Sequence, residues 1–146
     1  MVDFDRSVLG MESAAISYDV EKGAIRKFAE AIGDNNPIFY NEQAAQAAGF
    51  KTVVAPPTFL CTCRAQALPD LKIVFGGRVR LNGGNAYEYY RPVYAGDRIT
   101  VTAKYAEVTE RTGRTGNMVL VVTEFTFMNQ HGEVVARGRN TGIMRE

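Results

Sequence analysis

Residues 54–69 read VAPPTFLCTCRAQALP, and this stretch decides the fold. Two prolines precede residues 58–68, which are apolar nearly all round, and Pro69 closes the run. Proline is tolerated at the start of a helix, because the N–H that it lacks would have no partner there. A helix that is apolar on every side must be buried. The stretch therefore predicts a central core helix over residues 58–68, with Cys61 and Cys63 packed in the core.

The sequence after this stretch is dominated by strand patterns. Apolar and polar residues alternate with a period of two, which is typical of β-strands. Short glycine-containing sequences interrupt the alternation and are typical of turns. We therefore expect four strands, over residues 87–93, 99–108, 118–128 and 133–144.

The sequence before the stretch predicts one strand and two helices. Residues 14–20 alternate with a period of two. In residues 23–32 the apolar side chains instead follow the spacing of a helix, and Gly33 follows as a stop signal. Asn41 is a favourable N-cap for an alanine-rich helix over residues 42–48.

Together these patterns predict one α+β domain over residues 1–146, in which an antiparallel sheet wraps around the central apolar helix. A chain of 146 residues has the length of one ordinary domain. Such a sheet leaves edge strands uncovered, so we expect the chain to pair with a second subunit, either a copy of itself or another chain.

Composition and charge exclude several classes of protein. Lys and Arg number 17 against 16 Asp and Glu, which gives a net charge of +1, whereas nucleic-acid binding needs a basic surplus. No run approaches the roughly 18 apolar residues of a membrane span. Residues 1–10 lack the apolar core of a secretory signal. We therefore expect a cytoplasmic protein that binds neither nucleic acid nor membrane.

The cysteines and the histidine exclude further chemistry. Cys61 and Cys63 are too close for an ordinary disulfide and lack the spacing of a zinc site. His131, the single histidine, falls in a predicted hairpin turn. We therefore expect no metal site and no Ser–His–Asp triad.

Five stretches carry a family resemblance that extends from about residue 8 to residue 143. They are GDNNPI at 33–38, AGF at 48–50, VAPPTF at 54–59, GGNAYEYYRPV at 83–93 and AGD at 95–97. With these stretches the chain resembles the MaoC-like (R)-specific enoyl-CoA hydratases and dehydratases, which have the hot-dog fold. It looks most like their N-terminal FAS1-like dehydratase type, which includes the HadA-like subunit of heterodimeric acyl dehydratases.

The resemblance implies a reaction. The family adds water to, or removes it from, the 2,3 double bond of an acyl thioester carried on coenzyme A or acyl carrier protein. The carrier is then part of the substrate, and no separate cofactor is expected. Catalytic members carry an Asp-x4-His motif before the alanine-rich helix, because an acid and a base must converge on one double bond. Backbone N–H groups at the start of the central helix hold the thioester oxygen.

In this chain the motif is broken. Asp34 stands at the aspartate position, but Phe39 stands where histidine is required, and a phenyl ring cannot transfer a proton. Tyr40 is adjacent, although an unperturbed tyrosine, with its pKa of ~10, is a poor base near neutral pH. Asp34 is therefore either a catalytic carboxylate that activates water or a turn residue that caps backbone N–H groups. Tyr40 is either its catalytic partner or a core aromatic residue.

Further residues are candidates for substrate binding. The amides of Thr58 or Phe59 would hold the thioester oxygen, although simple helix initiation is the alternative interpretation. Asn82 stands where relatives can have histidine. A basic run either meets the phosphates of coenzyme A or lies at a solvated edge; it comprises Lys72, Arg78, Arg80 and Arg91. The full substrate-binding set is Asn36, Pro57, Thr58, Phe59, Asn82, Gly83 and Gly84.

Three functions compete. In the first, the chain is a subunit that shapes the acyl tunnel of a hydro-lyase complex, while a second hot-dog chain supplies the intact Asp/His pair. In the second, it is a homodimeric hydratase that is active alone through Asp34. In the third, it is an acyl-thioester binding module without turnover. Phe39 favours the first.

Overall fold

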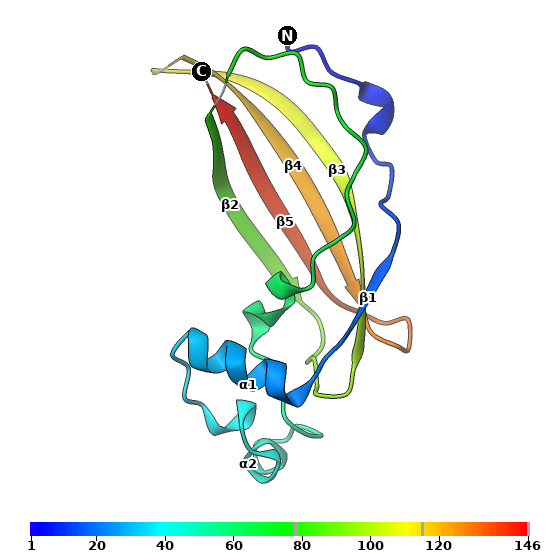
Figure 1. Cartoon of the computed structure of the whole chain (residues 1–146), viewed down its shortest axis with the longest axis vertical. Helices are drawn as coiled ribbons and strands as arrows, with labels where there is room; N and C mark the ends of the chain where they lie inside the picture. Colours follow the sequence, from blue (N-terminus) through cyan, green and yellow to red (C-terminus); the bar gives the residue numbers. More distant parts are fainter. Residues whose placement is uncertain (78, 115, 146) are drawn as a thin grey trace.

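The computed structural model describes residues 1–77, 79–114 and 116–145. Its five strands form one antiparallel sheet in the order β1-β3-β4-β5-β2, and the two α-helices lie at one end of this curled sheet (Figure 1). The strands are β1 (Ile16–Asp19), β2 (Val79–Tyr89), β3 (Arg98–Gly113), β4 (Gly116–Met128) and β5 (Val134–Arg145). The helices are α1 (Lys22–Ala31), α2 (Glu42–Ala47) and the 3₁₀ helices η1 (Arg6–Val8), η2 (Pro37–Phe39) and η3 (Pro57–Thr62). The predicted α+β class is confirmed.

The two α-helices follow the sequence signals. In α1, Ile25 and Ala29 are buried, and Gly33 continues the chain with a φ of +71°, a conformation that glycine adopts without strain. The Asn41 side chain accepts a hydrogen bond of 2.9 Å from the Ala44 amide at the start of α2. Both helices lie at the same end of the sheet (Figure 1).

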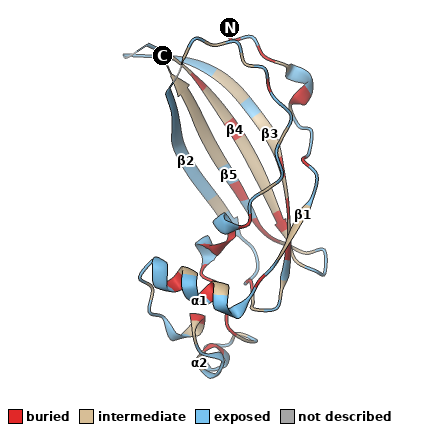
Figure 2. Cartoon of the chain, in the orientation of Figure 1, coloured by how far each residue is buried: buried red, intermediate tan, exposed pale blue. Residues whose placement is uncertain are grey.

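The core has two parts. The larger part lies where the helices meet the sheet and includes Ile25, Val53, Ile99 and Val135, all fully buried. Figure 2 shows buried residues on α1 and in the lower parts of the long strands. A smaller cluster packs the N-terminal segment against the far end of the sheet; it contains Val2, Phe4, Val8, Leu71 and Val119.

The prediction of a long central helix is wrong. Residues 58–68 contribute only to η3, which ends at Thr62, and the following segment has no helix and runs alongside the sheet toward its far end (Figure 1). The Thr62 hydroxyl donates to the Phe59 carbonyl at 2.8 Å, a local bond that competes with helix propagation. Cys63 is buried as expected, but Cys61 is exposed. The concave face of the sheet thus lacks the helix that was expected to fill it.

The first long strand also differs from the prediction. β2 begins at Val79 rather than residue 87, and it includes the glycine pair at 83–84. A Cβ at Gly83 would lie 2.7 Å from Ile143 Cδ1, so glycine permits β2 and β5 to approach here. The pairing register shifts between Asn82 and Gly84. β2 is consequently an edge strand of eleven residues, nearly all of them exposed.

No helix among the described residues is long and apolar enough to cross a membrane.

Candidate functional site

The loop between α1 and η2 holds the Asp of the broken motif. Asp34 Oδ1 accepts a hydrogen bond of 3.0 Å from the Asn36 amide. Asn36 Oδ1 in turn accepts from the Ile38 amide at 3.2 Å and caps η2. These are the contacts expected of turn residues. Catalytic use of Asp34 and substrate contact by Asn36 remain predictions.

Tyr40 and Phe39 have different environments. The Tyr40 hydroxyl donates a hydrogen bond of 2.7 Å to the Asp34 main-chain carbonyl, so this hydroxyl tethers the loop. Phe39 is buried, with 6% of its surface exposed, and its side chain faces an apolar cavity. Among the residues that line this cavity, neither Asp34 nor Tyr40 occurs. The phenyl ring at the histidine position is the member of the motif that reaches the cavity.

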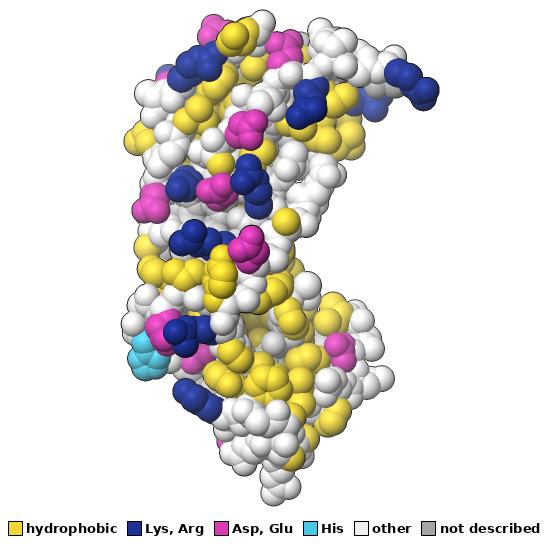
Figure 3. Space-filling view, turned by 180° about the vertical axis from the view of Figure 1, so that it is seen from behind, with side chains coloured by type: hydrophobic (Ala, Val, Ile, Leu, Met, Phe, Trp, Pro, Cys, Tyr) yellow, Lys and Arg dark blue, Asp and Glu magenta, His cyan; other side chains and the backbone are white. Residues whose placement is uncertain are grey.

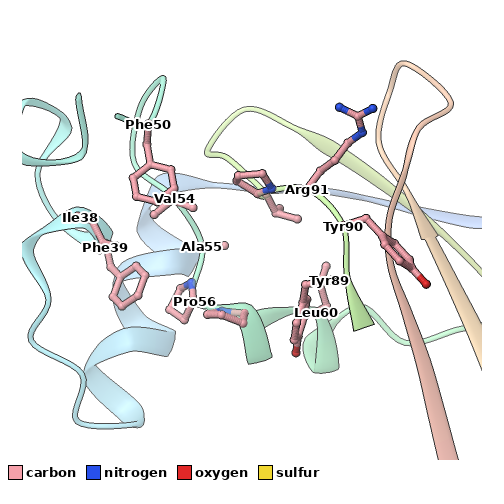
Figure 4. A pocket seen from close by; sticks show the side chains of 13 residues that line it. Ile38, Phe39, Phe50, Val54, Ala55, Pro56, Leu60, Tyr89, Tyr90 and Arg91 are labelled. Atoms are coloured by element: carbon pink, nitrogen blue, oxygen red, sulfur yellow. The ribbon is translucent and has the colours of Figure 1, made fainter. Parts of the chain in front are cut away.

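The apolar cavity has a volume of about 430 Å³ and lies between η2, η3 and the end of β2. Figure 4 shows Phe39, Pro56, Leu60 and Tyr89 around one space, with the Arg91 guanidinium turned away from it. On the rear face, hydrophobic side chains gather at the helical end of the molecule, beside a hollow in its outline (Figure 3). The lining is Ile38, Phe39, Phe50, Val54, Ala55, Pro56, Pro57, Leu60, Tyr89, Tyr90, Arg91, Pro92 and Val93. Such a lining suits an aliphatic chain.

The residues at the start of η3 lie in different environments. Pro57 lines the cavity, whereas Thr58 is exposed and Phe59 packs into the core against Phe28, with the rings edge to face at 5.7 Å. The Phe59 amide donates to the Pro56 carbonyl at 2.9 Å and closes the turn. The prediction that a backbone amide here holds the thioester oxygen therefore now applies to Thr58.

The predicted residues on β2 lie in a different place. Asn82 and Gly84 contribute to a cluster of amide groups on the concave face of the sheet. Asn140 Nδ2 on β5 contacts Asn85 Oδ1 at 2.8 Å, Asn82 Oδ1 at 3.1 Å and the Gly84 carbonyl at 3.4 Å. Sequence reasoning missed Asn85 and Asn140, because only the pairing of β2 with β5 brings residues 55 positions apart together.

Arg91 is the charged residue in the lining of the cavity, and its guanidinium turns away from the space (Figure 4). Arg91 Nη2 pairs with Glu133 Oε2 at 3.0 Å. A hydrogen bond from Asn129 lowers the pKa of Glu133, and the electrostatic effects of Arg91, His131 and Lys51 act in the same direction. Arg91 thus has an acidic partner. Arg78, another member of the predicted basic run, lies outside the described residues.

Burial changes the pKa of two tyrosine side chains on the concave face. Burial raises the pKa of the Tyr87 phenol. Burial also raises the pKa of the Tyr89 phenol, and the neighbouring Tyr87 has a smaller effect in the same direction. The two rings stack at 5.9 Å with an interplanar angle of 10°. Both phenols therefore stay neutral near pH 7 and offer hydroxyl and ring surfaces rather than charge.

Solved structures share this architecture. The ChsH1–ChsH2 complex from Mycobacterium tuberculosis matches with a TM-score of 0.79 and 21% identity, over 92% of this chain and 89% of that one. A MaoC-like dehydratase from Rhodospirillum rubrum matches with a TM-score of 0.72 and 22% identity, over 94% and 93%. The HadBC (3R-hydroxyacyl-ACP dehydratase) complex from M. tuberculosis matches with a TM-score of 0.75 and 25% identity, over 93% and 96%. The expected hot-dog fold is confirmed.

Relatives with similar sequences, and one family of domains, match most of the chain. A UPF0336 protein of Parafrankia sp. (strain EAN1pec) is 36% identical over 136 residues, which cover 89% of this chain and 86% of that protein. A UPF0336 protein of Saccharopolyspora erythraea is 31% identical over 146 residues, covering 97% and 91%. The family described as "FAS1-like, dehydratase domain region" matches residues 7–138. The chain therefore belongs to this FAS1-like dehydratase domain family.

Proposed function

We propose that the chain is a subunit of an acyl-thioester hydratase/dehydratase, in which it shapes the acyl tunnel while a second hot-dog chain supplies the catalytic Asp/His pair. The observation that carries the proposal is Phe39, which lines the apolar cavity at the position where the family's motif has histidine. Addition of water to a 2,3 double bond requires a proton donor and a proton acceptor at the reacting carbons. A phenyl ring is neither.

The polar groups of Asp34 and of the adjacent Tyr40 do not replace the histidine. The Tyr40 hydroxyl already donates to the Asp34 carbonyl, and Asp34 Oδ1 already accepts from the Asn36 amide. Neither residue lines the cavity. The cavity is accordingly suited to hold an acyl chain, whereas the proton transfer belongs to another polypeptide.

The edge strand supports a partner beside this cavity. β2 leaves one row of backbone groups unpaired with any other strand of the described sheet, and an uncovered edge of this length favours pairing with another strand. Tyr89 and Tyr90, at the end of β2, line the cavity and are 43% and 51% exposed. A second sheet joined at β2 would cover both rings and extend the cavity into a tunnel. The structural neighbours named as ChsH1–ChsH2 and HadBC complexes agree with a heteromeric assembly.

The test uses the purified full chain alone, a hot-dog chain with an intact Asp-x4-His motif that is sought first in the adjacent coding region, and the two together. Hydration of crotonyl-CoA is followed by loss of absorbance of the conjugated thioester. We expect background rates for this chain alone, because general acid–base help is worth about 10²- to 10⁴-fold, and robust turnover for the pair. Binding of the acyl-CoA without turnover in any combination would favour a binding module instead. Turnover by this chain alone would overturn the proposal.

A further inference from the structure

The outer, convex face of the sheet is apolar at the end away from the α-helices. The strand register places Leu81, Ile143 and Leu120 side by side in one row that crosses β2, β5 and β4. Val119 and Val121, on either side of Leu120 along β4, pack in the smaller core cluster. Because successive side chains of a strand point to opposite faces, the row with Leu120 points away from the core.

The neighbouring rows widen this apolar area. Met118 and Val79 lie in the row toward the end of the sheet, and Val122 lies in the row on the other side. Val79 and Leu81 are 45% and 47% exposed. Three rows on four strands cover roughly 400 Å² at the usual spacings of a sheet. An exposed apolar area of this size often marks an interaction surface. The apolar members of this convex patch are Val79, Leu81, Met118, Leu120, Val122 and Ile143.

Two opposite charges on β3 belong to the outer rows of the convex patch. Arg111 lies in the row of Met118, and Glu107 lies in the row of Val122. No ion pair engages Arg111 within the part of the chain that the structure describes. Glu107 lies 3.8 Å from Arg139, and 53% of its side chain is exposed. A base and an acid therefore lie one row above and one row below the central apolar row, and both are open to solvent.

This arrangement is complementary to itself. A two-fold axis along the central row brings the upper row of one copy opposite the lower row of a second copy. Leu120 then faces Leu120 of the second copy, and Met118 faces Val122. Arg111 faces Glu107, and the symmetry produces this pair twice. Two sheets packed face to face in this way bury the apolar side chains between them.

We propose that the convex patch binds a second copy of this chain back to back, with Arg111 of each copy paired with Glu107 of the other. Pairing through β2 uses backbone groups at the edge of the sheet and leaves this face open, so both contacts can form in one assembly. The two patches together bury roughly 800 Å², which is less than the minimum of about 1,200 Å² for a stable interface. The contact is accordingly weak and needs a higher concentration than pairing through β2. A partner that carries charges of one sign fits less well, because the patch presents both an acid and a base.

The test measures the molar mass of the full chain by sedimentation equilibrium from micromolar to submillimolar concentration. We expect the molar mass to double in the upper part of this range. Leu120→Asp should weaken this association at least about tenfold, because it places an unpaired charge in the apolar row. The matched control is Thr126→Asp, on the same strand and the same face but outside the patch, which should associate like the unaltered chain.

A charge exchange tests the orientation of the second copy. Arg111→Glu and Glu107→Arg should each weaken the association about fivefold or more, because each places like charges opposite one another. Arg139, which faces Glu107, keeps its 3.1 Å contact with Glu124 in both variants. Mixing the two variants pairs an acid with a base at both symmetry-related contacts and should restore the association of the unaltered chain.

Three results would overturn the proposal. The first is a molar mass that stays constant over the upper part of the concentration range. The second is association of Leu120→Asp as strong as that of the Thr126→Asp control. The third is a mixture of Arg111→Glu and Glu107→Arg that associates no better than either variant alone, with melting temperatures that show both variants to be folded. These measurements involve no turnover, so their outcome is independent of the assay for the proposed function.

Discussion

The Tyr40 hydroxyl donates a 2.7 Å hydrogen bond to the main-chain carbonyl of Asp34, so the residue next to the broken motif fixes the backbone of the motif's aspartate. The bond is partly buried and joins the turn after α1 to the residue that follows η2. We expect Tyr40→Phe to lower the free energy of unfolding by about 1 kcal/mol, the usual net value of such a bond. Urea denaturation measures this.

The matched control is Tyr90→Phe. The Tyr90 hydroxyl bonds to Glu88 Oε2 at 2.8 Å, but both residues are exposed, so its loss should change the free energy of unfolding by less than about 0.5 kcal/mol. If both variants unfold like the unaltered chain, Tyr40 does not hold the loop and its hydroxyl is available for catalysis.

A new negative charge should affect the stability of the fold very differently at two adjacent positions on η3. Phe59 is 6% exposed and packs against Phe28, so Phe59→Asp buries an unpaired carboxylate and should destabilise the fold by at least about 4 kcal/mol. Thr58 is exposed, and Thr58→Asp should leave soluble yield and melting temperature nearly unchanged. Normal yield and melting temperature for Phe59→Asp would show that η3 is not packed as described.

The success and the failure of the fold prediction have physical reasons. Residues 23–32 carry an apolar stripe and a glycine stop, and these two signals define α1 closely. Residues 58–68 carry no stripe, and an apolar run without periodicity does not distinguish a helix from a buried irregular segment. Only Phe59, Leu60 and Cys63 of this run are buried, and the Thr62 hydroxyl bonds to the preceding turn.

The exposed edge of the sheet predicts where a second subunit binds. Val79 and Leu81 on β2 are 45% and 47% exposed. We expect the full chain, alone or with its partner, to sediment as a dimer at micromolar concentration. Leu81→Asp should weaken the association at least tenfold, because it places a charge at the strand edge that pairs. Val74→Asp is the control, since Val74 is 71% exposed and lies outside the strand. A monomer at micromolar concentration, or equal effects of both variants, would contradict pairing through β2.

The candidate site could be predicted only in part. Asp34, Asn36 and Tyr40 lie close in sequence, and their turn contacts follow from local rules for Asp and Asn. Asn85 and Asn140 carry no local signal. Their contact depends on the register of β2 against β5, which shifts at Asn82 and Gly84, and a shift of one residue would turn the side chains to the other face.

The two cysteines should react at different rates. Cys61 is exposed, whereas Cys63 is buried, and burial raises the pKa of the Cys63 thiol above its ordinary value. Because the thiolate is the reactive form, less of Cys63 reacts at pH 8. We expect iodoacetamide to modify Cys61 at least tenfold faster in the folded chain, as measured by mass spectrometry of peptides. The difference should disappear in urea. Equal rates in the folded chain would place residues 61–63 differently from the structure.

The last prediction separates the structural role of Asp34 from a chemical one. In Asp34→Asn the carboxamide oxygen still accepts the Asn36 amide, so the turn and the melting temperature should be retained while the negative charge is lost. If the partner supplies the acid–base pair, the assembled complex should hydrate crotonyl-CoA at a rate within about threefold of the unaltered complex. Loss of a general base would instead slow the reaction by about 10²-fold or more. The same substitution at the partner's aspartate should abolish turnover and serves as the positive control. A loss of more than about 10²-fold from Asp34→Asn, with an unchanged melting temperature and assembly, would instead assign water activation to Asp34 in this chain.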